Sequence, residues 1–211
     1  MTDRDTRERI IDAAIDLFNE LGTGAATTNH IARAAGISPG NLYYHFRNKE
    51  EIILAIYERA ISVYDNVWRE AGAAPPGPEV MLDLLHKAFT HQWKYRCLQR
   101  EFPVLVRRDE ALASRYREMQ DRRREMFRAL FASWIDAGYA RPLSDDQLDD
   151  VILASWVLGE TWFAYIASMG RADDIGELRR GGRLVYTIIR PHLTEETAER
   201  MDAVLLQGGR G

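Results

Sequence analysis

Cysteine is almost absent from this sequence, which contains Cys97 alone among its 211 residues. One cysteine cannot close an intramolecular disulfide, and without several histidines nearby it cannot build a zinc site, so the chain suits a reducing compartment. The first residues, MTDRDTRERIIDAA, are charged from the third position and lack the apolar run and cleavage site of a secretory signal. We therefore expect a cytoplasmic protein.

Strand signals and internal repeats are also missing, and there are only 7 prolines. Instead, apolar residues recur at helical spacing almost throughout the chain, and the segment GAAPPGP at residues 72–78 predicts a loop that interrupts the pattern. The length allows one large domain or two small ones. The sequence thus predicts an all-α fold, with helices over residues 5–21, 28–35, 39–46, 48–70, 79–96, 110–137, 145–169, 172–190 and 195–206.

A long apolar run with a single charged residue is rare in the chain, and the main example is residues 151–170, VILASWVLGETWFAYIASMG. Its length matches the roughly 20 residues that cross a bilayer. Glu160 lies at its midpoint, however, where a carboxylate costs about 2.5 kcal/mol or more on insertion scales. We expect no membrane span, and instead a helix that is buried on most sides, in a core or against a second subunit.

Positive charge is in the minority, because 28 Lys and Arg face 32 Asp and Glu for a net charge of -4. Taken over the whole chain, this balance argues against a nucleic-acid partner. The distribution is uneven, since residues 22–49 contain Arg33, Arg47 and Lys49 and no acidic residue. A locally positive segment of an otherwise acidic protein permits contact with phosphates.

That same segment, GTGAATTNHIARAAGISPGNLYYHFRNK, predicts two short helices joined by a turn at Gly36, which is a helix-turn-helix. Thr27 and Ser38 stand where N-cap side chains accept from free backbone N–H groups. One face supplies a small core of Phe18, Ile31, Ala35, Ile37, Leu42 and Phe46. The opposite face carries amides, tyrosines, a histidine and cations, which reach phosphates and base edges in a major groove: Asn29, Arg33, Asn41, Tyr43, Tyr44, His45 and Lys49. A helical hairpin that only packs the N-terminus is the alternative.

The string AATTNHIARAAGISPGNLYYHFRNKEEI closely resembles the DNA-binding domain of the TetR (TetR/AcrR) family of bacterial transcriptional regulators, over about residues 8–55. The shared pieces are the TT pair, IA, AGIS, LYYHF and NKEE. The resemblance implies phosphate contacts for Thr28, Tyr43 and Lys49 and a backbone contact for His45. It places Asn29, Pro39, Gly40, Asn41 and Tyr44 near bases or adjoining phosphates, and we add Arg33 and Ser38 to this DNA-binding set. His30 replaces the acidic residue often found at its position, which we expect to weaken the capping box.

Aromatic residues are frequent on the helices predicted between residues 55 and 137, which in the resembled family enclose a small-molecule cavity. The resemblance implies a ligand-binding set of Tyr64, Trp68, Phe89, Trp93, Phe102, Phe131 and Trp134. Ordinary core packing is the alternative for each ring. The candidate polar groups of the cavity are His86, His91, Glu101 and Glu160. No metal site or cofactor is predicted, because His86 and His91 are five residues apart and the other ligand types do not cluster.

In the resembled family, the last two long helices of each subunit form a four-helix dimer bundle. Ala154, Ser155, Gly159 and Ala167 are small enough to allow close approach between such helices. A homodimer would place two recognition helices on half-sites about 34 Å apart, or a multiple of that distance.

These observations predict a DNA-binding domain at residues 1–50 and a helical ligand-binding and dimerisation domain at residues 51–211. The predicted function is a homodimeric repressor that binds a palindromic operator and is released by a small-molecule effector. An all-α enzyme is the first alternative, although the sequence offers no Ser/His/Asp or Cys/His set and no phosphate loop. The second is an activator, or a regulator without a ligand response.

Overall fold

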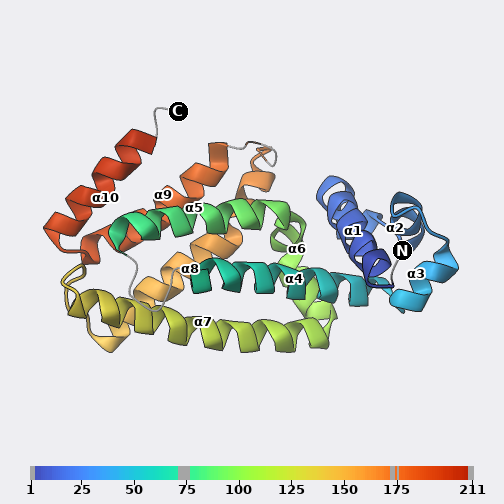
Figure 1. Ribbon diagram of the computed structural model, residues 1–211, viewed down its shortest axis with the longest axis horizontal. Helices are drawn as coiled ribbons and strands as arrows, with labels where there is room; N and C mark the ends of the chain where they lie inside the picture. The colour runs from blue at the N-terminus through green and yellow to red at the C-terminus, as the bar shows by residue number, and fades with distance from the viewer. Residues whose placement is uncertain (1–2, 71–76, 172–173, 175, 209–211) are drawn as a thin grey trace.

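The computed structural model describes residues 3–70, 77–171, 174 and 176–208. Within them the all-α prediction is confirmed, because the chain forms α-helices joined by short turns and one 3-10 turn, without a strand. The helices are α1 (Asp3–Ala25), α2 (Thr28–Ala34), α3 (Pro39–His45), α4 (Lys49–Glu70), α5 (Pro78–Lys94), α6 (Arg96–Arg108), α7 (Glu110–Asp136), α8 (Asp145–Ser168), α9 (Gly176–Ile189) and α10 (Glu195–Gly208). The first three lie at one end of an elongated molecule, and the others form its body (Figure 1).

Helix α6 is absent from the sequence prediction, which left residues 97–109 without an element. The helix begins one residue after α5 ends, and Tyr95 alone separates the two, with φ -106° and ψ 23°. It also contains Pro103, which removes one backbone donor from its interior. The apolar pattern continues across a break of one residue, and a proline lies inside the second helix. For these two reasons the sequence pattern does not indicate a separate helix.

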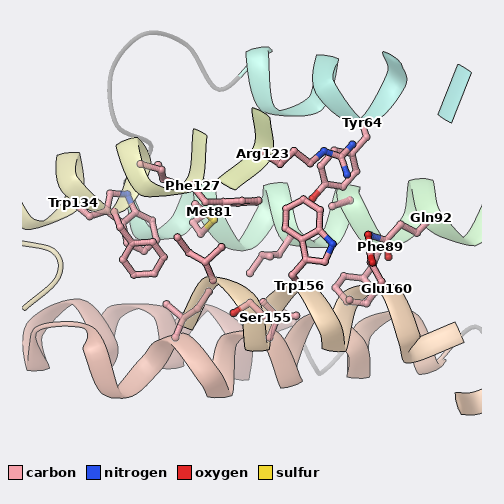
Figure 2. A pocket seen from close by; sticks show the side chains of 18 residues that line it. Tyr64, Met81, Phe89, Gln92, Arg123, Phe127, Trp134, Ser155, Trp156 and Glu160 are labelled. Carbon is pink, nitrogen blue, oxygen red and sulfur yellow. The ribbon is translucent and has the colours of Figure 1, made fainter. Parts of the chain in front are cut away.

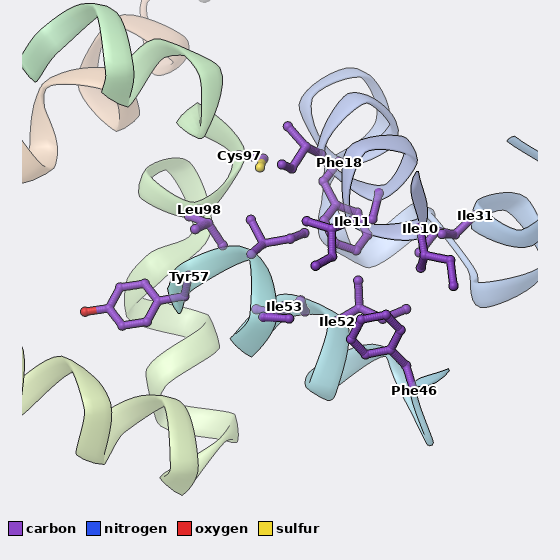
Figure 3. Close-up of a cluster of buried hydrophobic side chains, with 14 of the residues drawn as sticks. Ile10, Ile11, Phe18, Ile31, Phe46, Ile52, Ile53, Tyr57, Cys97 and Leu98 are labelled. Atoms are coloured by element: carbon purple, nitrogen blue, oxygen red, sulfur yellow. The ribbon is translucent and has the colours of Figure 1, made fainter. Parts of the chain in front are cut away.

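The buried apolar side chains form two clusters. The first core joins α1, α2, α3 and the first half of α4 to α6 and the start of α7, as shown by Phe18, Ile52 and Leu98 (Figure 3). The second core fills the body between α5, α7, α8, α9 and α10. The domain boundary predicted between residues 50 and 51 falls at the start of α4, and the first core continues across it. Helix α4 is thus packed into the DNA-binding end at its beginning and into the body at its end.

Helix α8 contains most of the long apolar run at residues 151–170. By length and composition it could cross a bilayer, and only 28% of its most apolar window is buried. The helix is therefore not buried on most sides within a single chain, and its burial against a second subunit stays a prediction. One face packs on α6, α7 and α9, and the opposite face exposes Leu153, Val157 and Tyr165, each more than half exposed. We call the exposed face, with Ala154 and Thr161, the outer face of α8.

Candidate nucleic-acid interface and effector cavities

The starting points of helices α2 and α3 are fixed by local side-chain contacts that the sequence predicts. The Thr27 hydroxyl accepts from the His30 backbone N–H at 3.2 Å, and the Ser38 hydroxyl accepts from the Asn41 N–H at 3.2 Å. Gly36 makes the turn between the helices with φ 65°, a conformation that favours glycine. The expected weakening at His30 does not remove the capping box, because its ring Nδ1 accepts from the Thr27 N–H at 3.5 Å. These caps fix where both helices begin.

The mini-core predicted for this unit is buried as expected, except that Ile37 is half-buried. Its packing pushes both tyrosines of α3 outward, with Tyr43 50% and Tyr44 76% exposed. The Tyr43 hydroxyl lies 3.0 Å from the Thr28 hydroxyl, which links α3 to the start of α2. Two exposed tyrosines on one short helix have no role in the core, so they are available to a partner.

The remaining predicted DNA contacts surround these tyrosines, and we call the set the recognition face. Its exposed members are Asn29, Arg33, Ser38, Pro39, Gly40, Asn41, Tyr43 and Tyr44, and its half-buried members are Thr28 and His45. The His45 ring meets the Tyr44 ring edge-on, with centroids 5.2 Å apart. The face therefore presents amides, hydroxyls and a cation on two adjacent helices, without an acidic residue.

Lys49 differs from the rest of the predicted set. Its Nζ donates to the Thr23 carbonyl at 2.6 Å and to the Ala26 carbonyl at 3.2 Å, and the side chain is half-buried. An ammonium group has three donors, so one is left for a phosphate. The structure thus assigns Lys49 a role in holding the end of α1 to the start of α4, while its phosphate contact stays a prediction.

Two cavities lie in the body. The apolar cavity, between α5, α7, α8 and α9, has a volume of about 90 Å³ and walls that include Leu85, Phe89, Phe131 and Trp134. Trp134 lies at one end, and a polar cluster lies at the other (Figure 2). The polar cavity, between α4, α5, α6 and α7, has a volume of about 100 Å³ and walls that include phenol, amide and imidazole groups: Tyr57, His91, Gln99 and Tyr116.

Four residues line both cavities and form the partition between them: Tyr64, Gln92, Arg123 and Glu160. The Arg123 guanidinium stacks 3.8 Å above the Tyr64 ring centroid and lies 3.4 Å from the Asp65 carboxylate. Glu160 accepts hydrogen bonds from the Tyr116 hydroxyl and from Gln120 Nε2. Burial raises the pKa of Glu160, and these hydrogen bonds oppose the rise.

The predicted ligand-binding residues divide between these cavities. Tyr64, Phe89, Phe131 and Trp134 line the apolar cavity, and Phe102 lines the polar cavity together with Tyr64. Trp93 is in the wall of neither one; it packs on Phe163 with ring centroids 5.8 Å apart, under the Arg96 guanidinium. The Trp68 side chain lies outside the described residues.

Among the four polar candidates, Glu160 and His91 line cavity walls, whereas His86 is exposed on α5. Glu101 lies elsewhere and accepts from the Thr23 backbone N–H at 2.9 Å. Sequence reasoning missed Arg123, Phe127 and Trp156. The signal for the first two was helical register, because residues 119, 123, 127, 130 and 134 share one face of α7.

Two family models match the chain: "Bacterial transcriptional repressor" over residues 64–201, and "Bacterial regulatory proteins, tetR family" over residues 10–56. The chain belongs to the TetR family of bacterial transcriptional regulators. Members of the TetR family are regulators rather than enzymes, and they bind DNA operators and effector ligands and act as dimers.

A crystal structure of a TetR-family regulator from Marinobacter aquaeolei VT8 is similar over 98% of both chains, with 33% identity and a TM-score of 0.86. The transcriptional repressor KstR2 of Mycobacterium tuberculosis is 29% identical over 74% of this chain and 78% of its own length. The regulator AcrR of Shigella flexneri is 30% identical over 42% of this chain. The chain spans less than half the length of the first curated relatives that it matches, 44% in the case of AcrR.

The small residues predicted for the dimer interface of this TetR-family chain do not share one surface. Ala154 is exposed on the outer face of α8, and Ala167 is half-buried. Ser155 and Gly159 line the apolar cavity of their own subunit. Ser155 and Gly159 thus face the interior of their own subunit, and the dimer interface of the four small residues stays a prediction.

Proposed function

We propose that this TetR-family chain is a cytoplasmic, homodimeric repressor that binds a palindromic operator and is released by a small-molecule effector. The observation that carries the proposal is the recognition face, where two exposed tyrosines and two exposed asparagines share adjacent short helices with Arg33. Side chains of these types read base edges and phosphates in a major groove. The function needs no cofactor, and the described residues form no group of three or more metal ligands.

The residues of the recognition face form two groups, according to where they lie on α2 and α3. Asn41 and Tyr44 lie on the exposed side of α3, and we assign them to base edges. Thr28, Tyr43 and Arg33 flank that side, and we assign them to phosphates, which position the helix without reading sequence. The hydrogen bond between Thr28 and Tyr43 fixes the separation of two of these phosphate-binding groups.

Dimerisation would use the outer face of α8. Leu153 is 59% and Val157 52% exposed, on a helix that otherwise packs into the body. A row of large apolar side chains at four-residue spacing is costly in water and marks an interaction surface. A two-fold pairing through this face would present two copies of α3 to one side of DNA, as a palindrome requires.

Release would follow from helix α4. Its middle supplies Tyr57 and its second half supplies Tyr64 to the cavities, and its first residue, Lys49, holds the carbonyls of Thr23 and Ala26 beside α2. An effector that favours a different position of α4 would therefore move both recognition units relative to each other. The ligand shifts the equilibrium by as much as its affinities for the two arrangements differ.

The test uses a palindromic fragment from the promoter next to the gene and three single variants. Asn41→Ala should lower operator affinity about 10- to 100-fold, the usual cost of one lost base contact. Arg33→Ala should also weaken binding and reduce the slope of log affinity against log salt by about 1. Arg124→Ala is the matched control, because it removes an exposed arginine from α7, far from the recognition face.

The control should keep the affinity and the salt slope of the wild type. If Asn41→Ala and Arg33→Ala also keep them, the recognition face does not bind the operator and the proposal is wrong. Equal affinity of the wild type for the promoter fragment and for random DNA would contradict specific repression.

A further inference from the structure

The walls of the two cavities contain buried polar atoms that have no hydrogen-bond partner among the described residues. In the apolar cavity these are Gln92 Oε1, Ser155 Oγ and Trp156 Nε1, and in the polar cavity they are the Tyr57 hydroxyl and Gln99 Oε1, while Arg123 Nε lies in the wall that both share. A buried polar group without a partner costs about 1–3 kcal/mol. Two of these atoms are amide oxygens, which accept hydrogen bonds only. A ligand that supplies O–H or N–H donors would therefore relieve part of this cost.

The charges in the walls nearly cancel. Arg123 and Glu160 both lie in the partition, and they are the guanidinium and the carboxylate that line the cavities. Burial lowers the pKa of His91, which therefore stays neutral near pH 7. An anionic ligand would be desolvated beside Glu160 and a cationic one beside Arg123, so each meets one repulsive partner. A ligand with several phosphates would need several cations, and these walls offer one.

The size of the cavities sets the length of the ligand. Their volumes are about 90 and 100 Å³. A cavity of about 150 Å³ holds a single benzene ring. Each cavity is thus smaller than the space that one ring needs. A ligand that contains a ring therefore has to occupy both cavities, with the stacked Tyr64 and Arg123 side chains displaced from between them.

We propose that the effector is an uncharged amphiphile with an aromatic ring or an equivalent apolar chain, whose apolar end fills the cavity near Trp134 and whose hydroxyl or amide donor reaches Gln92 or Gln99. This inference rests on the proposed function, because it names the ligand class of the same regulatory site. The effector spans both cavities and separates Tyr64 from Arg123.

The experiment uses three probes with a common biphenyl frame: 4-phenylphenol, biphenyl-4-carboxylate and biphenyl-4-methylammonium. Binding to the full chain at pH 7 is measured by calorimetry and by quenching of tryptophan fluorescence, since Trp134 and Trp156 line the apolar cavity. The uncharged probe should bind about tenfold more tightly than either ion. At least one of the single variants Gln92→Leu and Gln99→Leu should bind 4-phenylphenol more weakly, according to which amide the hydroxyl uses. The double variant should bind it about tenfold more weakly than wild type.

Gly159 offers a way to fill the apolar cavity without disturbing the fold. It lies in the cavity wall, and a Cβ built on it meets no heavy atom within 4 Å. Gly159→Leu should bind 4-phenylphenol about tenfold or more weakly than wild type, and Gly159→Ala should lose less affinity, because alanine fills less of the cavity. Ala132→Leu is the matched control, because it adds leucine to the exposed face of α7 and should keep wild-type binding.

Tighter binding of either ion, equal binding of all three probes, or binding of none at their solubility limits would overturn the ligand class. Full binding to Gly159→Leu would overturn the location. Operator release is read separately with the same probes. If the uncharged probe binds as expected and never releases operator, the proposed function fails while the ligand class stands. If an ion binds best and releases operator, the ligand class fails while the repressor stands.

Discussion

The DNA-binding end and the body differ in how completely their interiors are filled. Of the twelve largest side chains that are almost fully buried in the described part of the chain, nine belong to the first core, among them Phe18, Ile31 and Leu42. The second core encloses the apolar cavity, and the unpartnered polar atoms Gln92 Oε1 and Ser155 Oγ lie in that cavity's walls. The polar cavity is lined by Tyr57, Leu98 and Met119 of the first core, from α4, α6 and α7, and neither cavity is lined by α1, α2 or α3. The part of the first core that α1, α2 and α3 form is therefore the more completely filled one.

This difference matches the task proposed for each region. A recognition face must hold Asn41 and Tyr44 in fixed positions, and a filled core with capped helices does so. A ligand site needs space and polar groups that find their partners only when the ligand is bound. The two requirements meet in α4, which is packed in the first core at Ile52 and lines a cavity at Tyr64.

The largest predicted effect compares one side chain from each region. Phe18→Ala should lower the free energy of unfolding by about 3–5 kcal/mol, because it leaves a void in a filled core. Leu130→Ala, in the wall of the apolar cavity and only half-buried, should cost less than about 2 kcal/mol. Urea denaturation of both variants measures the difference. Equal losses would show that the body is as tightly packed as the DNA-binding end.

Two glycines in the body should respond in opposite directions. A Cβ at Gly181 would meet Phe89 and, at 2.8 Å, Trp162, because α9 approaches α5 and α8 closely there. Gly181→Ala should therefore destabilise the chain by about 1–3 kcal/mol. Gly159→Ala meets open space within a helix and should stabilise it by about 0.5–1 kcal/mol. A lower melting temperature for Gly159→Ala would contradict the open space beside Gly159, and a higher one for Gly181→Ala would contradict the close contact at Gly181.

The sequence predicted local features well and tertiary ones poorly. The caps at Thr27 and Ser38 and the exposure of Tyr43 and Tyr44 follow from neighbours within a few residues, so the pattern contains them. Cavity lining depends on which way each helix is rotated. Phe89 and Trp93 are four residues apart on α5, yet only Phe89 reaches a cavity, and Trp93 packs on Phe163 of α8 instead.

The same limit explains the residues that the sequence prediction missed. Arg123 lies between Arg122 and Arg124, and the run reads as a solvated face although the Arg123 side chain is only 14% exposed. Ser155 and Gly159 are small, and size alone suits both a helix–helix contact and a cavity wall. The structure places both in the wall of the apolar cavity, and no spacing rule within α8 contains that information.

The smallest predicted effect is a pH dependence of the folding stability, which arises from Glu160 in the partition. Burial raises the pKa of Glu160 above its ordinary value of 4.5, so the folded state disfavours the ionised carboxylate. Below pH 4.5 the group is protonated in both folded and unfolded chains and costs nothing; as the pH rises through the raised pKa, stability is lost. Glu160→Gln removes this loss and keeps an acceptor for Tyr116. The variant should therefore gain stability relative to wild type between pH 4.5 and 7.

Melting temperatures at stepped pH values check this, with Glu125→Gln on the exposed face of α7 as the control for a general change in charge. The advantage of Glu160→Gln should grow with pH, whereas that of the control should not follow the same course. If Glu160→Gln instead loses stability as the pH rises, attraction to Arg123 outweighs burial in the partition. The ionised carboxylate would then stabilise the body through its charged partner. Only the cavities would remain as a difference in packing between the body and the DNA-binding end.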